Sequence, residues 1–307
     1  MDPTPNRTVP GEGIEADRYV CPDLRVRPDG IDAETQLVGV LGYPVRHSLS
    51  PLMHNAAFRH LGLNWVYLAF EVPPESLADA VRGMRALGIR GLNLTIPHKE
   101  ASLALVDALT PAAQAIGAVN TLFWDEGRLI GDNTDAEGFL RAVRSAGCAL
   151  GGMALVLGAG GAARAVVYAL KSIGCPVVLA NRTPERGRAL GHALGVEQVL
   201  PLTQEALRPL MPQVQLVVNC TPVGMEPDID TMPDVPLDAL PSGAWVCDLV
   251  YRPVQTRLLR TAQQRGCLTI DGLGMLVYQG ALAFERWTGI PAPLEIMREA
   301  LVSSTTV

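Results

Sequence analysis

The chain has 307 residues, of which 48% are hydrophobic and only 18% charged, so it is apolar enough for about two domains with buried cores and excludes a mostly disordered protein. Its net charge of −6 argues against a general nucleic-acid binder, because such proteins need surplus cations against phosphate. The six cysteines form no C-x-x-C pair, which is typical of a protein from a reducing compartment.

The sequence also argues against a membrane partner. Its longest uncharged stretch, residues 145–163, contains six glycines, so a strand followed by a glycine-rich turn explains it better than a membrane helix. Residues 1–36 are acid-rich and lack the apolar segment of a signal peptide. We therefore expect a cytoplasmic protein.

Residues 1–36 are predicted to form a flexible N-terminal extension, because they are rich in proline and acidic residues and show neither a strand nor a helix period. A docking segment is the alternative, since residues 19–21 are locally apolar.

Short apolar runs then alternate with helical patterns. Strands are predicted over 37–41, 65–72 and 89–96, and helices over 50–61, over 74–87 and from Pro97 onward. Ser50 is expected to be the N-cap of the first helix. Residues 119–124 and 128–130 flank Asp125-Glu126-Gly127, which predicts a hairpin, and a helix follows from Thr134 to Gly147.

The second half repeats the alternation more regularly. Strands are predicted over 153–157, 177–180, 216–219, 245–249 and 268–270, and helices over 162–173, 184–193, 205–211 and 256–265. Two final helices, 273–287 and 293–302, have no strand after them and should pack back on the first half. The fold class is α/β: two α/β domains with parallel sheets between helices and a cleft between the domains.

The strongest motif is the sequence from Gly158 to Ala163, which reads G-x-G-x-x-A between a predicted strand and a predicted helix. Glycines there let the backbone turn tightly and approach a pyrophosphate at the helix N-terminus. This predicts a dinucleotide site and a Rossmann-type domain. A turn that only packs the strand on the helix is the alternative.

At the end of the next predicted strand stand Asn181, Arg182 and Thr183, with Arg186 one turn further on. NAD-binding domains usually carry an acidic residue there, which would repel a 2′-phosphate. A guanidinium can instead grip that phosphate with two hydrogen bonds, so NADP is the predicted cofactor. Surface arginines without a ligand are the alternative.

Lys99 is a candidate catalytic residue. The chain has 23 arginines but only two lysines, and Lys99 follows a predicted strand, where open α/β sheets bind ligands. A lysine can give up a proton, which a guanidinium cannot. Asp135, at a predicted helix start, is its candidate partner, although a first-turn acid is also common for structural reasons alone.

Other polar side chains are candidates for a small-molecule site. Ser48 and Ser50 are expected on one side of an extended loop, and Met275 and Gln279 share one helix face. The five histidines show no metal-ligand spacing, so we predict no metal.

Several runs between about residues 37 and 300 are distinctive: GYP, HSLSPLMHN, GLNLTIPHK, GAVNT, GDNTD, LGAGGAARA, NRT, NCTPVGM, DLVYRP and GLGMLVYQGALAFERWTG. In this order they resemble the shikimate dehydrogenase family, which includes shikimate/quinate dehydrogenases. The resemblance implies a substrate domain over 37–136 plus 272–307 and an NADP-binding Rossmann domain over 137–271. It implies NADP-dependent, reversible reduction of 3-dehydroshikimate to shikimate in aromatic amino-acid (chorismate) biosynthesis.

The same resemblance implies roles for individual residues. Lys99 and Asp135 would be the catalytic pair. The substrate would contact Ser48, Ser50, Thr95, Lys99, Asn120, Asp135, Tyr251 and Gln279. The cofactor would contact Gly158, Ala159, Gly160, Gly161, Ala162, Asn181, Arg182, Thr183, Arg186, Thr221, Val250, Gly272 and Met275. Placing the two sets on different domains implies hinge closure before hydride transfer.

Two other functions compete with this interpretation. One is a quinate/shikimate dehydrogenase that uses NAD, against which Arg182 and Ser50 argue. The other is a non-catalytic NADP-binding sensor, which would have no need of Lys99 and Asp135. The sequence leaves the assembly open, with a homodimer as one candidate.

Overall fold

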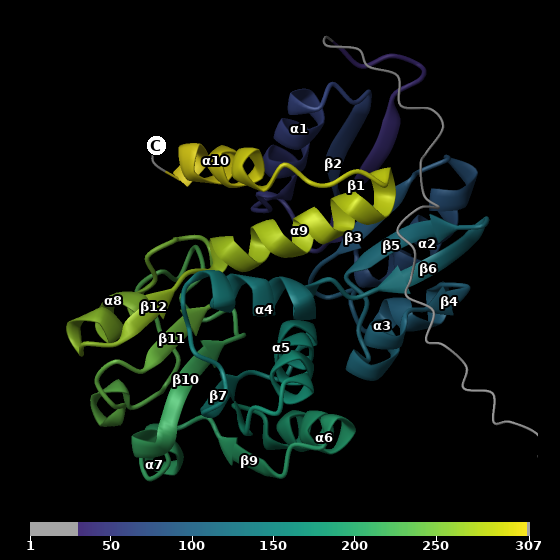
Figure 1. The fold of residues 1–307 in the computed structure, drawn as a ribbon. Coiled ribbons are helices and arrows are strands. Elements are labelled where there is room, and N and C mark those ends of the chain that lie inside the picture. Colours follow the sequence, from purple (N-terminus) through teal and green to yellow (C-terminus); the bar gives the residue numbers. More distant parts are fainter. Residues whose placement is uncertain (1–29, 306–307) are drawn as a thin grey trace, which may run out of the picture.

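The computed structural model describes residues 30–305, so most of the predicted extension lies outside the described residues. Two six-stranded sheets lie at opposite ends of the molecule, with the long helix α9 (Gly272–Thr288) and α4 (Asp135–Ser145) running between them (Figure 1). The two-sheet α/β architecture predicted from the sequence is confirmed. Within the described residues, no helix is both long and apolar enough to cross a membrane.

The first sheet has the strand order β2-β1-β3-β5-β6-β4. Its strands are β1 (Gln36–Gly42), β2 (Trp65–Glu71), β3 (Gly91–Leu94), β4 (Ala108–Leu109), β5 (Thr121–Asp125) and β6 (Arg128–Asp132). The prediction of a parallel sheet is wrong here, because β5 pairs antiparallel with both β3 and β6. The predicted hairpin explains the pairing of β5 with β6: Glu126 and Gly127 both have positive φ, 48° and 76°, as a tight type I′ turn requires.

Helices cover both faces of this sheet. Val38 and Val40 of β1 face a core built with α1 (Ser50–His60), α9 and α10 (Leu294–Thr305), whereas Leu41 and its neighbours face a core under α2 (Leu77–Ala86). The prediction that the two last helices pack back on the first half is confirmed, since α9 and α10 both contact α1 (Figure 1).

The second sheet is entirely parallel, in the order β12-β11-β10-β7-β8-β9. Its strands are β7 (Met153–Leu157), β8 (Val177–Asn181), β9 (Gln198–Pro201), β10 (Val214–Asn219), β11 (Trp245–Asp248) and β12 (Leu268–Ile270). Its helices are α5 (Gly161–Ser172), α6 (Pro184–Leu194), α7 (Gln204–Leu207) and α8 (Arg257–Gln264). Numbered from β7, this is the order 3-2-1-4-5-6 of dinucleotide-binding sheets, whose ligands bind where the order reverses, between β7 and β10.

Several local predictions are wrong. No helix begins at Pro97; residues 96–100 form turns and a short 3₁₀ helix follows over Ala101–Leu105. The helix predicted over 205–211 is only the short α7. The sequence analysis also missed β4, β9 and the helix α3 (Pro111–Ile116). The first two are very short edge strands, on which the alternation of polar and apolar side chains is too brief to be recognised.

Candidate active site

A cleft with a volume of about 150 Å³ opens where the carboxyl ends of the first sheet face the start of α9. It is lined by Val40, His47, Ser48, Ser50, Asn93, Leu94, Thr95, Lys99, Asn120, Asp135, Ala162, Leu249, Tyr251, Gly272, Met275, Leu276 and Gln279. The cleft therefore brings together every side chain that the sequence analysis assigned to substrate. Three of the predicted cofactor residues, Ala162, Gly272 and Met275, also line it.

An ion pair between Lys99 and Asp135 is the main charged feature of the cleft. Lys99 Nζ lies 2.6 Å from Asp135 Oδ2. The Asp135 side chain is only 5% exposed and that of Lys99 17% exposed, so the pair is largely shielded from water yet open on the lysine side. An ammonium held in such a place interacts strongly with any charge that develops beside it.

Lys99 lies in the turn after β3 rather than in a helix. The Lys99 carbonyl accepts a hydrogen bond from the Val119 N–H at 2.8 Å, so it is unavailable to a helical partner. The Nε2 atom of the neighbouring His98 lies 2.8 Å from the Val72 carbonyl oxygen, which ties the turn to the end of β2. The backbone of Lys99 is therefore fixed by the first sheet.

Asp135 is the first residue of α4. Its own N–H donates to Asn133 Oδ1 at 3.1 Å, and the carboxylate lies at the helix N-terminus, where the helix dipole favours a negative charge. Thr134 occupies the cap position, but its side chain makes no capping hydrogen bond.

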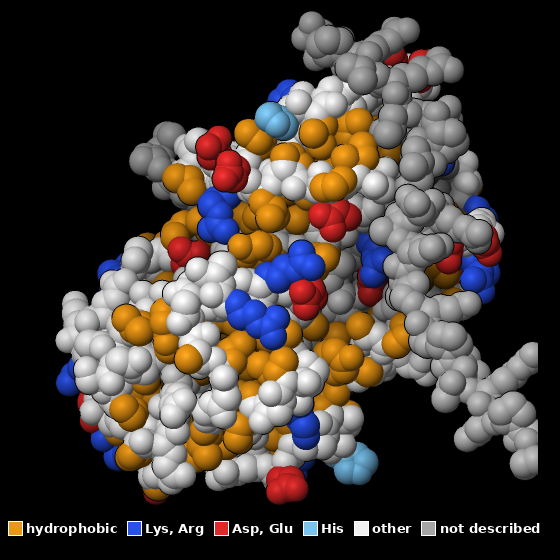
Figure 2. Space-filling view, viewed as in Figure 1, with side chains coloured by type: hydrophobic (Ala, Val, Ile, Leu, Met, Phe, Trp, Pro, Cys, Tyr) orange, Lys and Arg blue, Asp and Glu red, His pale blue; other side chains and the backbone are white. Residues whose placement is uncertain are grey.

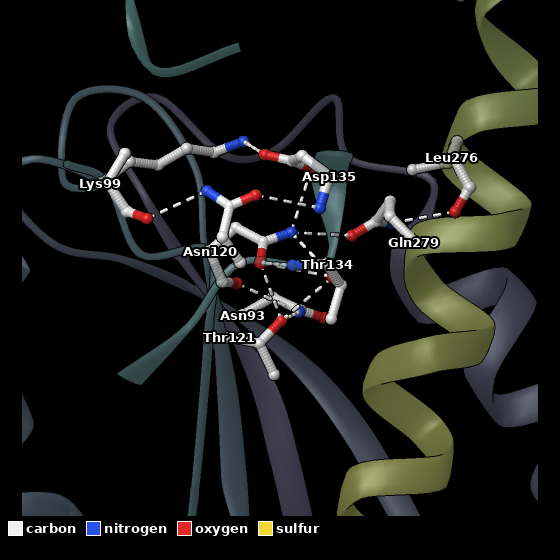
Figure 3. Close-up of polar contacts among 10 residues, drawn as sticks. Asn93, Lys99, Asn120, Thr121, Thr134, Asp135, Leu276 and Gln279 are labelled. Carbon is white, nitrogen blue, oxygen red and sulfur yellow. Dashed lines mark hydrogen bonds and ion pairs between the residues drawn. The ribbon is translucent and has the colours of Figure 1, made fainter. Parts of the chain in front are cut away.

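Asn120 links the ion pair to the rest of the cleft (Figure 3). Its Nδ2 lies 2.9 Å from Asp135 Oδ1, 2.9 Å from Thr134 Oγ1 and 3.3 Å from Gln279 Oε1, while its Oδ1 accepts from the Thr134 N–H at 2.8 Å. Gln279 Nε2 in turn donates to the Leu276 carbonyl at 2.8 Å. The network fixes the orientation of the carboxylate and of both amide side chains.

The sequence analysis missed the buried polar side chains behind this network. Asn93 Nδ2 donates to the Asn120 carbonyl and lies 3.1 Å from Thr121 Oγ1, and Asn93 Oδ1 accepts from the Tyr67 hydroxyl at 2.8 Å. All four residues of β3 are buried, so the one polar side chain in Gly-Leu-Asn-Leu is the signal that could have identified Asn93. Burial raises the pKa of the Tyr67 phenol well above its ordinary value, which keeps it a hydrogen-bond donor.

The two serines come from the start of α1 and the residues just before it. Both line the cleft, but the expected N-cap is wrong: Leu49 is the cap residue, and Ser48 Oγ accepts from the Ser50 N–H at 3.3 Å. Leu49 has helical dihedrals and is buried in the core, so the loop is not extended as predicted. Burial raises the pKa of the neighbouring Tyr251 phenol, against smaller lowering effects of Arg252 and a hydrogen bond with Ser48.

The glycine-rich turn fits a pyrophosphate. Gly158 has a φ of +110°, which side chains rarely adopt, and α5 begins at Gly161 after a cap at Gly160. A Cβ atom added at Gly160 would meet no protein atom within 4 Å, so this turn leaves room at the helix N-terminus for an anionic ligand. Ala159 lies within the turn, between the first two glycines.

The remaining predicted cofactor residues lie outside the cleft lining, although Thr221 lies beside the turn, where a Cβ atom added at Gly158 would be 3.1 Å from Thr221 Cγ2. Asn181 ends β8, and Arg182, Thr183 and Arg186 follow it on the way into α6. Thr221 Oγ1 donates to Asn219 Oδ1 at 2.7 Å, and the Val250 N–H donates to Asp248 Oδ1 at 3.1 Å. Within residues 30–305, no three His, Cys, Asp or Glu side chains are grouped so that they could hold a metal ion.

Comparisons with known proteins identify the family. Residues 40–122 match the shikimate dehydrogenase substrate-binding domain, 142–225 the shikimate/quinate 5-dehydrogenase family and 272–302 the shikimate 5′-dehydrogenase C-terminal domain. The chain is 51% identical to shikimate dehydrogenase (NADP(+)) of Methanopyrus kandleri, over 89% of this chain and 97% of the relative. The enzyme of the same name from Moorella thermoacetica is 50% identical, over 90% and 97% of the two chains.

Among solved structures, the chain is similar to shikimate 5-dehydrogenase of Thermus thermophilus in complex with NADP(H) and shikimate. The TM-score is 0.79 with 46% identity, and the match covers 88% of this chain and 100% of the other. The predictions of family and of fold class are confirmed, and the names of these relatives agree with the predicted cofactor. The chain belongs to the shikimate dehydrogenase family.

Proposed function

We propose that this chain catalyses the reversible, NADP-dependent reduction of 3-dehydroshikimate to shikimate, with Lys99 and Asp135 as the catalytic pair. The observation that supports the pair most directly is the shielded ion pair in the cleft, at 2.6 Å, among side chains that can bind a polyol and a carboxylate. Chorismate biosynthesis is the proposed setting.

NADPH, when bound, supplies the hydride. As hydride reaches the ring carbonyl carbon, negative charge builds on the carbonyl oxygen. The Lys99 ammonium stabilises this charge and then gives a proton to the oxygen, leaving a neutral amine; in the reverse direction the neutral Lys99 amine receives the proton of the shikimate hydroxyl. Asp135 holds the ammonium in place and accepts from a substrate hydroxyl.

The other side chains of the cleft bind and orient the substrate. Ser48, Ser50 and Tyr251 line the cleft, with the Tyr251 and Ser48 side chains hydrogen-bonded, and we assign to them the substrate carboxylate. Thr95, Asn120 and Gln279 supply hydrogen bonds to ring hydroxyls. Because Asn120 and Gln279 are already held by the network, little of their side-chain freedom remains to be lost on binding.

We assign NADP to the carboxyl edge of the second sheet. The glycine turn 158–162 would hold the pyrophosphate, and Arg182 and Arg186, with Asn181 and Thr183, would hold the 2′-phosphate. Thr221, Val250, Gly272 and Met275 would line the nicotinamide. A Cβ atom at Gly272 would approach the Leu249 carbonyl oxygen to 2.6 Å, so α9 begins in close contact with this edge.

We further propose the domain division expected from the sequence: a substrate domain over 37–136 plus 272–307 and an NADP-binding domain over 137–271. The cleft between them would close around both ligands. Two cores belong to the first sheet and the last two helices, and one belongs to the second sheet alone, which supports this division; a fourth core joins the second sheet to Ile116, Ala118 and Met275 of the first unit. Cytoplasmic location and a homodimer are the proposed compartment and assembly. Analytical ultracentrifugation tests the dimer, which a purely monomeric sedimentation profile would exclude.

A four-way oxidation assay tests the reaction. Purified protein receives shikimate or quinate with NADP or NAD, and reduced nicotinamide is followed by its absorbance. We expect turnover chiefly with shikimate and NADP. A preference for quinate or NAD would favour the first alternative, and binding without turnover in any combination would favour a sensor.

Lys99→Ala tests the catalytic pair. We expect turnover to fall by about 10²- to 10⁴-fold, the usual contribution of a positioned acid or base, with little loss of shikimate affinity. Lys171→Ala is the matched control, because Lys171 is the second lysine and lies at the far end of α5, bonded to the Gly195 carbonyl. Wild-type turnover in Lys99→Ala would refute the assignment.

Arg182→Asp tests the cofactor assignment. An acidic side chain would repel the 2′-phosphate and could accept from a ribose hydroxyl, so NADP affinity should fall far more than NAD affinity. Arg188→Asp serves as a control in the helix that follows, since Arg188 is exposed and pairs with Glu185. An unchanged ratio of NADP to NAD affinity in Arg182→Asp would contradict the assignment.

On the face viewed in Figure 2, Lys and Arg side chains lie beside Asp and Glu and among hydrophobic ones rather than in one basic field. This mixed charge suits a small-molecule enzyme better than a protein that binds along a nucleic-acid backbone.

A further inference from the structure

The glycine turn contains one more glycine than a dinucleotide site requires. In the pattern G-x-G-x-x-A, Gly158 and Gly160 are the pattern glycines, and Gly161 occupies an unrestricted position. Gly161 is the first residue of α5 and is not among the glycines with positive φ. Neither the nucleotide pattern nor the backbone conformation therefore explains why this position lacks a side chain.

The side chain of Lys99 lies directly against Gly161. A Cβ atom added at Gly161 would lie 3.1 Å from Cδ and 3.2 Å from Cβ of Lys99, tighter than ordinary van der Waals contact. At Gly160, by contrast, an added Cβ atom would meet no protein atom within 4 Å. The two adjacent glycines thus differ in what they touch.

A second contact joins the same two segments. Arg164, one turn into α5, places Nε 3.6 Å from a carboxylate oxygen of Glu100, the residue after Lys99. Its Nη1 donates to the Ile116 carbonyl at 3.3 Å, at the C-terminal end of α3. The first turn of α5 therefore contacts the side chain of the residue after Lys99 as well as the stem of the Lys99 side chain.

We infer that Gly161 is a positioning residue for Lys99. The lysine stem rests against the first turn of α5, and its ammonium is held by Asp135 at the start of α4, so the side chain is fixed at both ends. Any side chain at position 161 must push the stem aside by a few tenths of an ångström or more. This role rests on the proposed function, because it matters for catalysis only if Lys99 transfers the proton.

The two-lysine composition supplies a readout that does not depend on activity. Full-length protein made with ε-¹³C-lysine has two lysine signals in a carbon–proton correlation spectrum, and Lys171→Ala identifies which of them belongs to Lys99. We expect Gly161→Ala to shift the Lys99 signal and leave that of Lys171 unchanged. Gly160→Ala should leave the Lys99 signal unchanged.

Steady-state kinetics then tests the consequence. We expect kcat to fall about 3- to 10-fold in Gly161→Ala and about 100-fold in Gly161→Val, because small displacements of a reacting group are costly. In a Lys99→Ala background, Gly161→Val should cause no further loss of kcat, since there is no ammonium left to misplace. Gly160→Ala should weaken only the approach of the pyrophosphate, so its effect should appear in the KM for NADP and not in shikimate affinity.

The outcomes separate this inference from the proposed function. An unshifted Lys99 signal in both Gly161→Ala and Gly161→Val would overturn the contact. A shifted signal with unchanged kcat, or an equal loss of kcat from Gly161→Val with and without Lys99, would overturn the positioning role. Full activity of Lys99→Ala alone would refute the catalytic pair, whatever the spectra of the glycine variants show.

Discussion

His54 gives the protein a specific sensitivity to acid. Its side chain is fully buried in α1, stacked on the Tyr67 ring with centroids 4.4 Å apart and close to Trp287 at 5.3 Å. Within the described part of the chain, neither ring nitrogen has a hydrogen-bond partner. Burial among these rings lowers the pKa of His54 from 6.5 to about 3, because the charged imidazolium would lose its hydration.

The sign and size of the effect follow from linkage. Between pH 6.5 and 3 the unfolded chain binds a proton that the folded chain excludes, so stability falls as pH falls through this range. The slope approaches about 1.4 kcal/mol per pH unit, so between about pH 7.5 and 4.5 His54 alone removes about 3 kcal/mol. His54→Phe, which keeps an aromatic ring but cannot titrate, should lack this loss.

Urea unfolding from about pH 7.5 to 4.5, followed by tryptophan fluorescence, measures the difference. Trp65 and Trp287 lie in the same core cluster as the aromatic neighbours of His54, so their fluorescence reports on the unfolding of this core. His60→Gln, at the exposed end of the same helix, should retain the wild-type pH dependence. If the stability curves of wild type and His54→Phe run parallel over this range, the reasoning is refuted.

Two further predictions concern groups that support the cleft. Burial raises the pKa of Asp248 from 3.8 to about 6, so its ionisation opposes folding increasingly as the pH rises through this range. Relative to wild type, Asp248→Asn should gain about 2 kcal/mol of stability between about pH 4 and 7, and a constant difference in urea unfolding would contradict this. Gly138→Ala should destabilise by about 1 to 3 kcal/mol in thermal unfolding, because its Cβ atom would lie 2.8 Å from the backbone nitrogen of Gln279 where α4 packs on α9. Gly83→Ala, on α2 with nothing within 4 Å, should instead stabilise by about 0.5 to 1 kcal/mol; equal shifts in both variants would exclude the packing explanation.

The agreement between sequence and structure is best where a feature is local in the chain. The strand, glycine turn and helix around Gly158 are determined by residues that are neighbours in the sequence. The same is true of the hairpin at Glu126-Gly127. The missed helix α3 also had a local signal: Thr110 accepts from the Ala113 N–H, Pro111 follows, and Gly117 ends the helix at a φ of 70°. The helix predicted to begin at Pro97 does not form, because the Lys99 carbonyl accepts a hydrogen bond from the N–H of Val119, which is distant in sequence, and so is not available within a helix.

Residue types, local periods and their order along the chain were enough for the α/β class, the dinucleotide turn and the candidate pair Lys99 and Asp135. Which side chains converge depended on the packed molecule. Asn120 and Gln279 are 159 residues apart, yet the Asn120 side-chain amide donates hydrogen bonds both to Gln279 and to Asp135 of the ion pair. Likewise, Gly161 contacts Lys99 because the carboxyl ends of both sheets face one cleft. Such contacts depend on how helices and sheets pack against one another, and short-range patterns in the sequence do not predict that packing.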